Sequence, residues 1–557
     1  MIAKIAIKHR ISSDLVFDYI VSSPVPLYSV VEVPFGSRKE LGLIIGFKNY
    51  SRQAKKEVSK VISAGAVFNR TQITLAALVA DYFISPFGPT LMSFLPNLPK
   101  KELAKIGAET PPVSFKKSKN KLVISSAENR IGFYLQNIAI DKQNLIVLPS
   151  VLQVEKTSKQ AAKIFKSGFV YCWHSRLSPK QKRIIWQKCL QGDNLLVVGT
   201  RDSLFLPFCK LKKIFIDEPS SYAYFNDQLP YYNAFKVSRL LQKKLNSDLA
   251  VGESTPSLIS YIAYKKGTFS KIEIKDQSKY EVFGCFESEI KIPSVVKKIT
   301  GKLSGAKRIL IVGPFKNKGR LICPDCGEII CNSCGEQIFN HNLTCTSCKK
   351  SLECCPKCHS QNIRLSGYQK QPIKKFFSKH LPATSIQFSD LEKIKVLPPV
   401  FDFAVIPYFT QMSKFPFIGY QEKMFASIAS INSIVQKTIL IFASEQDNFL
   451  TDILTNNWQR FNRQKLIERK IEGLPPFKKA IKIVFRDNRK KFETAIKKIL
   501  RKFAIAPPLY VNQNKLGNKT EALIILDQKH FLKIKRLLKK QLTAKMHFIV
   551  DPVDFGL

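Results

Sequence analysis

The sequence predicts a multidomain α/β protein. The chain has 557 residues, which is enough for three or more domains. Between residues 121 and 265, short apolar runs alternate with helical stretches, and such bounded runs are typical of buried parallel strands. The runs are Leu145–Leu148, Leu195–Val198, Lys213–Glu218 and Leu249–Gly252. Eight cysteines between residues 323 and 358 indicate a separate small module within the chain.

The flanking regions predict further domains. Residues 1–100 contain short apolar runs broken by SSPVP and PFG, followed by a helix over Thr71–Phe83, so we expect a β-rich domain. Residues 101–120 are polar and basic and are interpreted as a linker. A second α/β lobe is expected over 266–470, with strands at Ile309–Gly313, Phe403–Ile406 and Thr438–Phe442. Residues 471–557 alternate strands and helices and predict an α+β C-terminal domain.

The charge indicates a polyanionic partner. The formal net charge is +47, from 89 basic and 42 acidic residues, and nucleic-acid phosphates are the obvious counterpart. A generally basic proteome or a membrane-surface protein would give the same excess. The sequence has no apolar run of the ~20 residues needed to span a bilayer, and its first residues lack a signal-peptide core. We therefore expect a cytoplasmic protein with no membrane partner.

The cysteines form four CxxC pairs, a pattern that favours zinc. Two such pairs complete one closed Cys₄ shell, so four pairs hold two Zn²⁺ ions of a structural kind. Reduced core cysteines or disulfides are the alternative. Spacing alone does not fix which pairs share a metal, and Cys354 could replace Cys355. The pairs are Cys323/Cys326, Cys331/Cys334, Cys345/Cys348 and Cys355/Cys358.

A cluster of aromatic residues follows the acidic pair Asp217–Glu218. It comprises Tyr222, Tyr224, Phe225, Tyr231 and Tyr232. Aromatic rings beside positive charge suit base stacking on single strands. A hydrophobic loop packed onto the other lobe explains the same residues equally well, and both interpretations stay open.

Several motifs resemble the PriA family, primosomal protein N′, the bacterial replication-restart DNA helicases. FDY at Phe17–Tyr19, VEVPFG at Val31–Gly36 and LGLIIGF at Leu41–Phe47 resemble its N-terminal 3′-DNA-binding domain. HSRLSPKQKRIIW, VVGTRDSLFLPF and VGESTPS resemble elements of its first helicase lobe, in the same order. The cysteine run and the closing HFIVDPVDFGL match the family as well.

The resemblance implies a fold and a set of functional residues. It implies two RecA-like helicase lobes with a double-zinc Cys₄ insertion at 321–366. The outer cysteine pairs would hold one zinc and the inner pairs the other. A pocket for the DNA 3′ end would use Phe17, Asp18, Gly36 and Lys56, and the strand would meet Arg201, Tyr222, Tyr224 and Tyr231. Implied partners are forked and single-stranded DNA, single-stranded DNA-binding protein, other primosome proteins and the helicase loader, in the bacterial cytoplasm at the nucleoid.

The departures from the family pattern concern the motor. A P-loop needs glycines, a lysine and a hydroxyl to hold nucleotide phosphates and Mg²⁺. Here the corresponding stretch is LVISSAENRIGFYLQ, with Arg130 at the lysine position and Ile131 at the hydroxyl position. The acidic box keeps Asp217 and Glu218 but continues as Pro219-Ser220, and the second-lobe GRAGR element is absent. We therefore expect two Zn²⁺ ions but neither ATP nor Mg²⁺, and no ATP hydrolysis by this helicase fold.

Two other functions fit parts of the sequence. One is an active ATP-dependent 3′–5′ DNA helicase of the primosome, which would need a non-standard phosphate site. The other is a zinc-ribbon protein that binds RNA or has a structural role.

Overall fold

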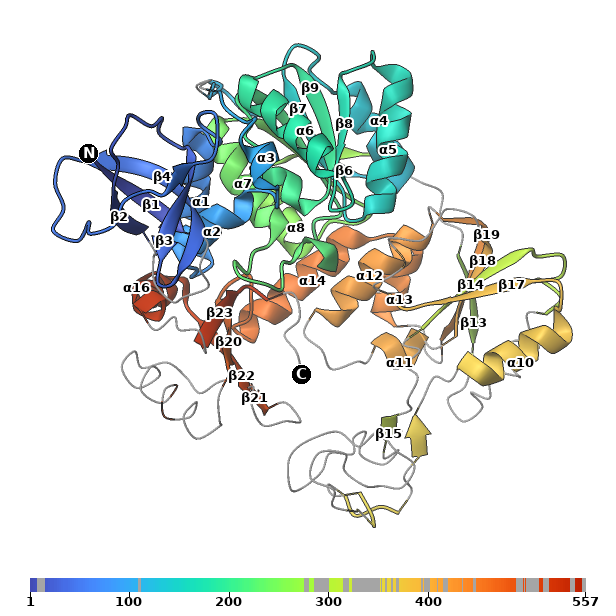
Figure 1. Cartoon of the computed structure of the whole chain (residues 1–557). Helices are drawn as coiled ribbons and strands as arrows, with labels where there is room; N and C mark the ends of the chain where they lie inside the picture. The colour runs from blue at the N-terminus through green and yellow to red at the C-terminus, as the bar shows by residue number, and fades with distance from the viewer. Residues whose placement is uncertain are drawn as a thin grey trace. The chain divides into compact units, whose positions relative to one another are not determined.

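The computed structural model divides into two compact units (Figure 1). One comprises Met1–Lys275 with Asn462–Leu557, and the other comprises Asp276–Phe461. The structure describes residues 1–7, 16–108, 112–274, 280–284, 300–313, 320–322, 351–391 and 394–443 with short gaps, 447–486, 494, 496, 510–513, 520–540 and 546–552. Within these residues, no helix combines the length and the apolar character that a membrane crossing requires.

An antiparallel sheet forms the first domain, with strand order β2-β1-β4-β3-β5. Alternate side chains of these strands point inward, as the apolar alternation of the sequence predicts. The inward set forms a cluster that includes Ile5, Tyr19, Val31 and Ile44. The strands are β1 (Ile2–Ile7), β2 (Val16–Ile20), β3 (Val30–Phe35), β4 (Arg38–Lys48) and β5 (Lys60–Val61).

Residues 56–61 close this sheet into a small barrel. The segment pairs with β2 through the Ile20–Glu57 bridge and then continues into β5, which pairs with β3. The N–H of Val58 donates to the carbonyl of Ile20 at 3.0 Å, a distance typical of hydrogen bonds between paired strands. Closure leaves both edge strands of the domain paired along part of their length.

Three helices follow the barrel and attach it to the next domain. They are α1 (Arg70–Tyr82), α2 (Phe87–Phe94) and α3 (Lys100–Leu103). Asn69 caps α1 in a capping box with Gln72, and its side-chain amide also donates to the carbonyls of Pro207 and Phe208. Within this unit, the barrel domain is therefore joined to the first lobe by hydrogen bonds.

The stretch predicted to be a linker is fixed to the first lobe. The N–H of Val113 donates to the carbonyl of Cys209, and the N–H of Phe115 donates to the carbonyl of Leu245. Ile106 is fully buried. The described part of residues 101–120 therefore lies against the protein.

The first lobe is built on a seven-stranded parallel sheet with order β12-β6-β11-β10-β7-β9-β8. Its strands are β6 (Asn120–Ile124), β7 (Gln143–Val147), β8 (Val170–Trp173), β9 (Leu195–Gly199), β10 (Leu211–Asp217), β11 (Asp248–Glu253) and β12 (Ser270–Glu273). All seven run parallel, as near-continuous apolar runs require. Strand β12 extends the sheet beyond the predicted domain boundary at residue 265.

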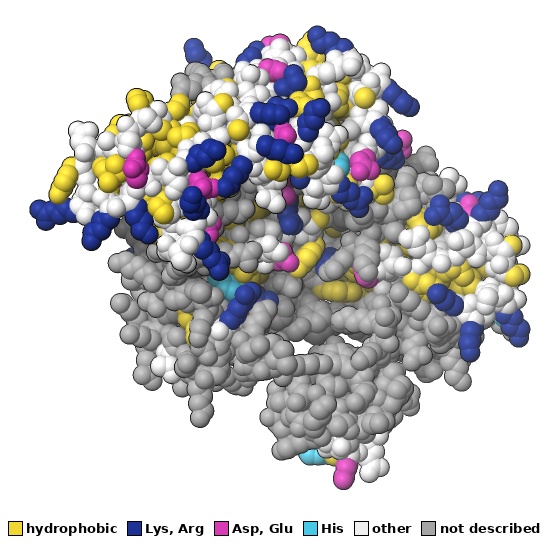
Figure 2. Space-filling model, in the orientation of Figure 1, with side chains coloured by type: hydrophobic (Ala, Val, Ile, Leu, Met, Phe, Trp, Pro, Cys, Tyr) yellow, Lys and Arg dark blue, Asp and Glu magenta, His cyan; other side chains and the backbone are white. Residues whose placement is uncertain are grey.

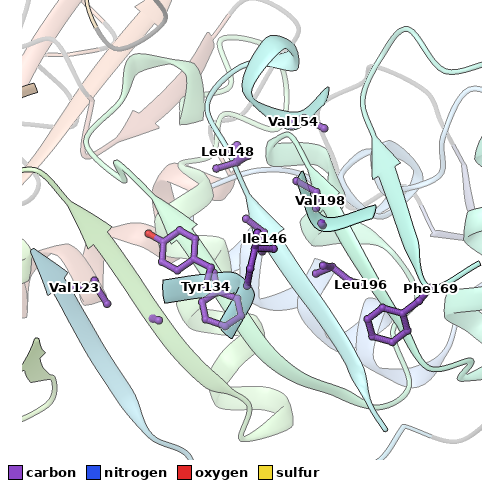
Figure 3. Close-up of a cluster of buried hydrophobic side chains, with 12 residues drawn as sticks. Val123, Tyr134, Ile146, Leu148, Val154, Phe169, Leu196 and Val198 are labelled. Carbon is purple, nitrogen blue, oxygen red and sulfur yellow. The ribbon is translucent and has the colours of Figure 1, made fainter. Parts of the chain in front are cut away.

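Helices α4 (Ala127–Gln136) and α5 (Val151–Ile164) cover one face of this sheet. Their apolar side chains meet those of the strands in one buried cluster, in which Tyr134 lies beside Ile146 and Val123 (Figure 3). The lobe also contains α6 (Pro179–Gln191), α7 (Ala234–Leu245), α8 (Leu258–Lys265) and the 3₁₀ turns η1 (Arg201–Phe205) and η2 (Tyr222–Tyr224).

The second unit contains a five-stranded parallel sheet with order β13-β19-β18-β14-β17. Its strands are β13 (Tyr280–Gly284), β14 (Arg308–Val312), β17 (Ser385–Ser389), β18 (Phe401–Ile406) and β19 (Val435–Ala443). Its helices are α10 (Lys370–His380), α11 (Phe409–Ser413), α12 (Tyr420–Ile431) and α13 (Asn448–Leu454), and α14 (Trp458–Ile471) crosses the boundary between the units. Strands β15 (Arg320–Ile322) and β16 (Arg364–Ser366) pair antiparallel and enclose the cysteine segment.

The C-terminal domain has an antiparallel sheet of order β21-β22-β20-β23. Its elements are β20 (Lys479–Phe485), β21 (Tyr510–Gln513), β22 (Thr520–Leu526), α16 (Gln528–Lys540) and β23 (Met546–Val550). The predicted α/β multidomain fold is thus confirmed, with a β-rich first domain and two parallel sheets. The cysteines from Cys323 to Cys348 lie outside the described residues.

Candidate functional site

The connection between β6 and α4 stands where a nucleotide phosphate loop would be. β6 ends at Ile124 and α4 begins at Ala127, so only Ser125 and Ser126 join them. A P-loop instead places a glycine-rich turn of backbone N–H groups between its strand and its helix. A two-residue connection without glycine cannot form that cradle.

The guanidinium of Arg130 occupies the position beside the acidic box. Its Nε and Nη2 donate to the two carboxylate oxygens of Asp217 at 2.7 and 3.0 Å. Nη2 also lies 2.9 Å from Oε1 of Glu218. The fork geometry of a guanidinium matches a carboxylate in this bidentate manner. One arginine thus pairs with both acids that the sequence singles out.

All three charged side chains are buried, which makes their pairing obligatory. The Arg130 side chain is 1% exposed, and those of Asp217 and Glu218 are 3% and 5% exposed. Burial lowers the pKa of Arg130, but the charges of Asp217 and Glu218 outweigh it and hold that pKa above its ordinary value. The guanidinium is therefore a permanent cation within the lobe.

Further hydrogen bonds complete this network. Nη1 of Arg130 donates to the carbonyl of Ser125 and to Oγ of Ser254. The Tyr134 hydroxyl donates to Oδ1 of Asp217 at 2.8 Å, and Ser254 donates its backbone N–H and its hydroxyl to Glu218. A charged group removed from water is tolerated when its donors and acceptors are met in this way.

Gly252 provides the space for the network. A Cβ at this position would stand 1.7 Å from the Tyr134 hydroxyl and 2.8 Å from Cδ of Arg130. Any larger residue on β11 would therefore displace the arginine or the tyrosine. The glycine of the VGESTPS motif thus has a steric role in this lobe.

Glu253 is a second buried acid at the end of β11. It is fully buried, it accepts from the N–H of Ser257 at 3.2 Å, and its Oε2 has no hydrogen-bond partner in the described structure. Burial is the main cause that raises the pKa of Glu253, to about 7, and the nearby charge of Glu218 adds to the rise. Arg130 does not pair with this acid.

The aromatic loop after the acidic box is mostly internal. Tyr224 is fully buried and donates its hydroxyl to the carbonyls of Val147 and Asp217. Tyr231 is 8% exposed and stacks on His547 of the C-terminal domain, with ring centroids 4.8 Å apart. Tyr222 is 51% exposed. Of the three tyrosines predicted to meet the strand, only Tyr222 offers its ring to solvent.

Arg201 organises this loop. Its guanidinium donates to the carbonyls of Ala223 and Phe225 at 2.9 and 2.7 Å and to the side chain of Asn226. These contacts use much of its donor capacity on the protein itself. The predicted contact of Arg201 with a DNA strand therefore competes with contacts that fix the loop.

Asp18 lies on the outer face of the barrel domain in a polar cluster. Nζ of Lys48 and the hydroxyl of Ser51 donate to Oδ2 of Asp18 at 2.7 and 2.5 Å. These two hydrogen bonds are the largest causes that hold the pKa of Asp18 below its ordinary value. The carboxylate thus stays ionised and remains an acceptor for a hydroxyl group.

The other three residues of the predicted pocket each have a different local environment in the barrel domain. Phe17 faces the barrel interior, because successive residues of a strand point to opposite sides, and its ring meets Phe35 edge-on at 5.3 Å. Gly36 adopts a left-handed φ of +59° in the turn between β3 and β4. Lys56 has an exposed side chain, and its carbonyl accepts from the N–H of Ile20.

The described part of the cysteine module is short. Cys355 is fully buried, Cys354 is half-buried and Cys358 is exposed. The chain folds back at this pair, with the N–H of His359 donating to the carbonyl of Cys355. Strands β15 and β16 pair with each other on the two sides of this segment in the sequence. This donor set fits a closed thiolate shell, although the described residues contain no group of three or more potential metal ligands.

Comparison with known proteins shows similarity to PriA replication restart proteins. The family model of the PriA 3′DNA-binding domain matches residues 4–96. The replication restart protein PriA of Borreliella burgdorferi is 26% identical over 542 residues, an alignment that covers 81% of each chain. This chain is thus similar to PriA replication restart proteins over most of its length.

Other PriA proteins and solved structures match over shorter ranges. PriA of Helicobacter pylori strain J99 is 26% identical over 54% of this chain and 50% of its own length. Among solved structures, RecG bound to a three-way DNA junction is 12% identical, with a TM-score of 0.35 over 73% of this chain and 52% of that chain.

Sequence reasoning missed several residues of the Arg130 network and of the cluster around Asp18. Tyr134, Ser254 and Gly252 join the Arg130 network only through the fold, and no local motif signals them. Lys48 and Ser51 are 30 and 33 residues from Asp18 in sequence. The pairing of β1 with both β2 and β4 places Asp18 and Lys48 on one face of the sheet, so a predicted strand order would have brought them together.

Replacing Arg130 with methionine tests the buried network. The substitution keeps a similar volume but leaves two buried carboxylates unpaired, so we expect a loss of about 3–5 kcal/mol in unfolding free energy. Urea unfolding monitored by fluorescence of the buried Trp173 and Trp186 reports on this lobe.

A double-mutant cycle provides the control for that variant. In a background that carries both Asp217→Asn and Glu218→Gln, Arg130→Met should cost much less, because no buried negative charge remains to be paired. An equal cost in both backgrounds would show that packing, and not charge, accounts for the effect.

Replacing Glu253 with glutamine tests the second buried acid. Its folded-state pKa of about 7 exceeds the ordinary 4.5, so the folded state loses stability as pH rises from 4.5 to 7. Glu253→Gln removes this loss and should raise the unfolding free energy at pH 8 by about 3 kcal/mol. The gain should vanish near pH 4.5, whereas the exposed Glu128→Gln should show no such gain. A pH-independent effect of Glu253→Gln would contradict the assignment.

Proposed function

We propose that this chain is a PriA-like protein of replication restart that recognises forked and single-stranded DNA and the nascent 3′ end, with its ATPase motor inactive. The single observation that carries the inactive motor is the Arg130 network. A working motor of this fold keeps its acidic box free to bind Mg²⁺ and nucleotide. In this chain the acids are occupied by a side chain of the same lobe.

Three features of the first lobe together oppose nucleotide binding. The β6–α4 connection offers no glycine-rich nest for phosphates. The cation that should meet those phosphates points instead into the lobe and is nearly inaccessible to solvent. The two acids that should hold Mg²⁺ already have a full positive charge within 3.0 Å. Binding ATP would require the breaking of a buried salt bridge before any new contact could form.

The DNA-binding part of the proposal rests on the barrel domain and on charge. The match of residues 4–96 to the PriA 3′DNA-binding domain supports a DNA partner. Lysine and arginine side chains are spread over the visible face of the described residues and outnumber acidic ones (Figure 2). Asp18 supplies an ionised acceptor for a 3′-hydroxyl, with Lys48 beside it for the neighbouring phosphate.

The remaining parts of the proposal follow from the similarity to PriA proteins. Cys323, Cys326, Cys355 and Cys358 would hold one zinc, and Cys331, Cys334, Cys345 and Cys348 would hold the other. A closed Cys₄ site supplies structure and no reactive water. Single-stranded DNA-binding protein, other primosome proteins and the helicase loader are the proposed partners, and the bacterial cytoplasm is the proposed location.

Nucleotide binding by the purified full-length protein tests the inactive motor. We expect no binding of ATP with Mg²⁺ up to millimolar concentration in calorimetry, and no hydrolysis when forked DNA is added. The affinity for forked DNA should be the same with and without ATP. Hydrolysis that DNA stimulates and that Glu218→Gln abolishes would instead establish the active helicase.

Changing Asp18 to asparagine tests recognition of the 3′ end. Because a hydrogen bond to a charged acceptor contributes about 1.5–3 kcal/mol, we expect roughly ten-fold weaker binding to forks that end in a 3′-hydroxyl. Forks that end in a 3′-phosphate should lose much less, as fluorescence anisotropy can measure.

Glu57→Gln is the matched control for Asp18→Asn, because it removes one exposed negative charge from the same domain. It should leave the ratio of the two affinities unchanged. An equal loss on hydroxyl and phosphate ends for Asp18→Asn would remove the 3′-end pocket from the proposal.

A further inference from the structure

A dense group of lysines lies at the amino-terminal edge of the first-lobe sheet. Because the seven strands are parallel, their starting residues meet at one edge, and Asp217 and Glu218 lie at the opposite edge. Four adjacent strands, β6, β11, β10 and β7, begin there. The lysines at or just before these starts are Lys116, Lys117, Lys119, Lys121, Lys142, Lys210, Lys212 and Lys213.

Few acids balance this edge. Asp248 accepts from Nζ of Lys213 at 2.8 Å and lies 3.5 Å from Nζ of Lys212. Asp141 pairs with Lys142. Within the described residues, the side chains of Lys119 and Lys121 form no ion pair, so their charges are available to a ligand.

A cavity of about 260 Å³ opens between this edge and the end of α4. Its polar lining comes from Lys119, Lys121, Lys213, Asp248 and Asn137, and Phe133 of α4 forms an aromatic wall. Nζ of Lys121 lies 5.4 Å from the centroid of the Phe133 ring. Phe133 is only partly buried, so one portion of the ring is open to the cavity.

The chemistry of this cavity matches a nucleic acid strand. An aromatic ring next to several lysines provides stacking for a base and counter-charge for its flanking phosphates. Lys119 and Lys121 are two residues apart on an extended segment, so they lie roughly 7 Å apart and can meet successive groups of one strand. An acidic peptide would use the lysines but would leave the ring without a stacking partner.

We propose that this edge is a second binding site for single-stranded DNA, with a base against Phe133 and phosphates on Lys119, Lys121 and Lys213. The inference rests on the proposed DNA-binding function. It places the new contacts at the amino-terminal edge of the sheet, opposite to the edge that carries Asp217 and Glu218. In this arrangement one DNA arm lies across the first lobe while the barrel domain holds the 3′ end.

The double variant Lys119→Ala/Lys121→Ala tests the site in the full-length protein. Its binding to a fork with a long single-stranded arm is measured by anisotropy at several salt concentrations. The slope of log affinity against log salt should fall by about 1.4, since each lost contact to single-stranded phosphate contributes ~0.7. Phe133→Leu should weaken binding at least five-fold without changing this slope, because stacking releases no counterions.

Lys163→Ala/Lys166→Ala is the matched control. These exposed lysines lie at the end of α5 and just beyond it, before β8. Strand β8 is five strand positions from β6 in the sheet, or roughly 24 Å at ~4.8 Å between neighbouring strands. The control carries the same change in net charge, and its slope should fall by less than half as much. Lys119, Lys163 and Lys166 are exposed and Lys121 is half-buried, and equal melting temperatures would show that both double variants fold.

The outcomes separate this site from the proposed function. If wild type binds the fork but both double variants lose the same slope, the binding is diffuse and the second site is overturned. Polyglutamate could displace the fork only from proteins with intact Lys119 and Lys121, while Phe133→Leu binds the fork as wild type does. That result would also overturn the second DNA site and favour an acidic polypeptide as the ligand. Failure of wild type to bind forked DNA at all would overturn the proposed function itself.

Discussion

The salt bridge between Arg130 and the acidic pair is the constraint on which the first lobe depends. Three charged side chains are nearly inaccessible to water, and Arg130 lies within 3.0 Å of both carboxylates. Buried ion pairs of this kind add little net stability compared with apolar residues, but the loss of one partner is severe. The network therefore fixes the conformation of the β6–α4 corner and prevents it from opening around a ligand.

The neighbours of the salt bridge are adapted to it. Gly252 leaves room for Tyr134 and Arg130, the Tyr134 hydroxyl meets Asp217, and Ser254 meets Glu218. The tyrosine also joins the apolar cluster beneath α4, so the polar network and the core share one side chain (Figure 3). The short β6–α4 connection and the internal cation thus belong to one structural arrangement, and our proposal of an inactive motor rests on it.

Nucleic acid contacts need not depend on that corner. The barrel domain closes on itself and is hydrogen-bonded to the lobe through Asn69, so its outer face is held independently of any nucleotide. The aromatic loop is also held by the protein, since Arg201 binds three of its groups. These fixed surfaces agree with the function that we propose, in which the protein holds DNA and another protein unwinds it.

The amino-acid pattern was sufficient to locate the parallel strands, because burial on both faces requires apolar runs. The absence of glycines before Arg130 was also visible in the sequence and led to our proposal of an inactive motor. Only the tertiary structure decided where the side chains go. The Arg130 guanidinium turns to Asp217, 87 residues away. Tyr224 is buried, a choice that the sequence left open between base stacking and a packed loop. Asp18 meets Lys48 through strand pairing. The reason is physical: local patterns fix backbone conformation, whereas the partner of a charge or a ring is set by which distant segments the fold brings within a few ångströms of it.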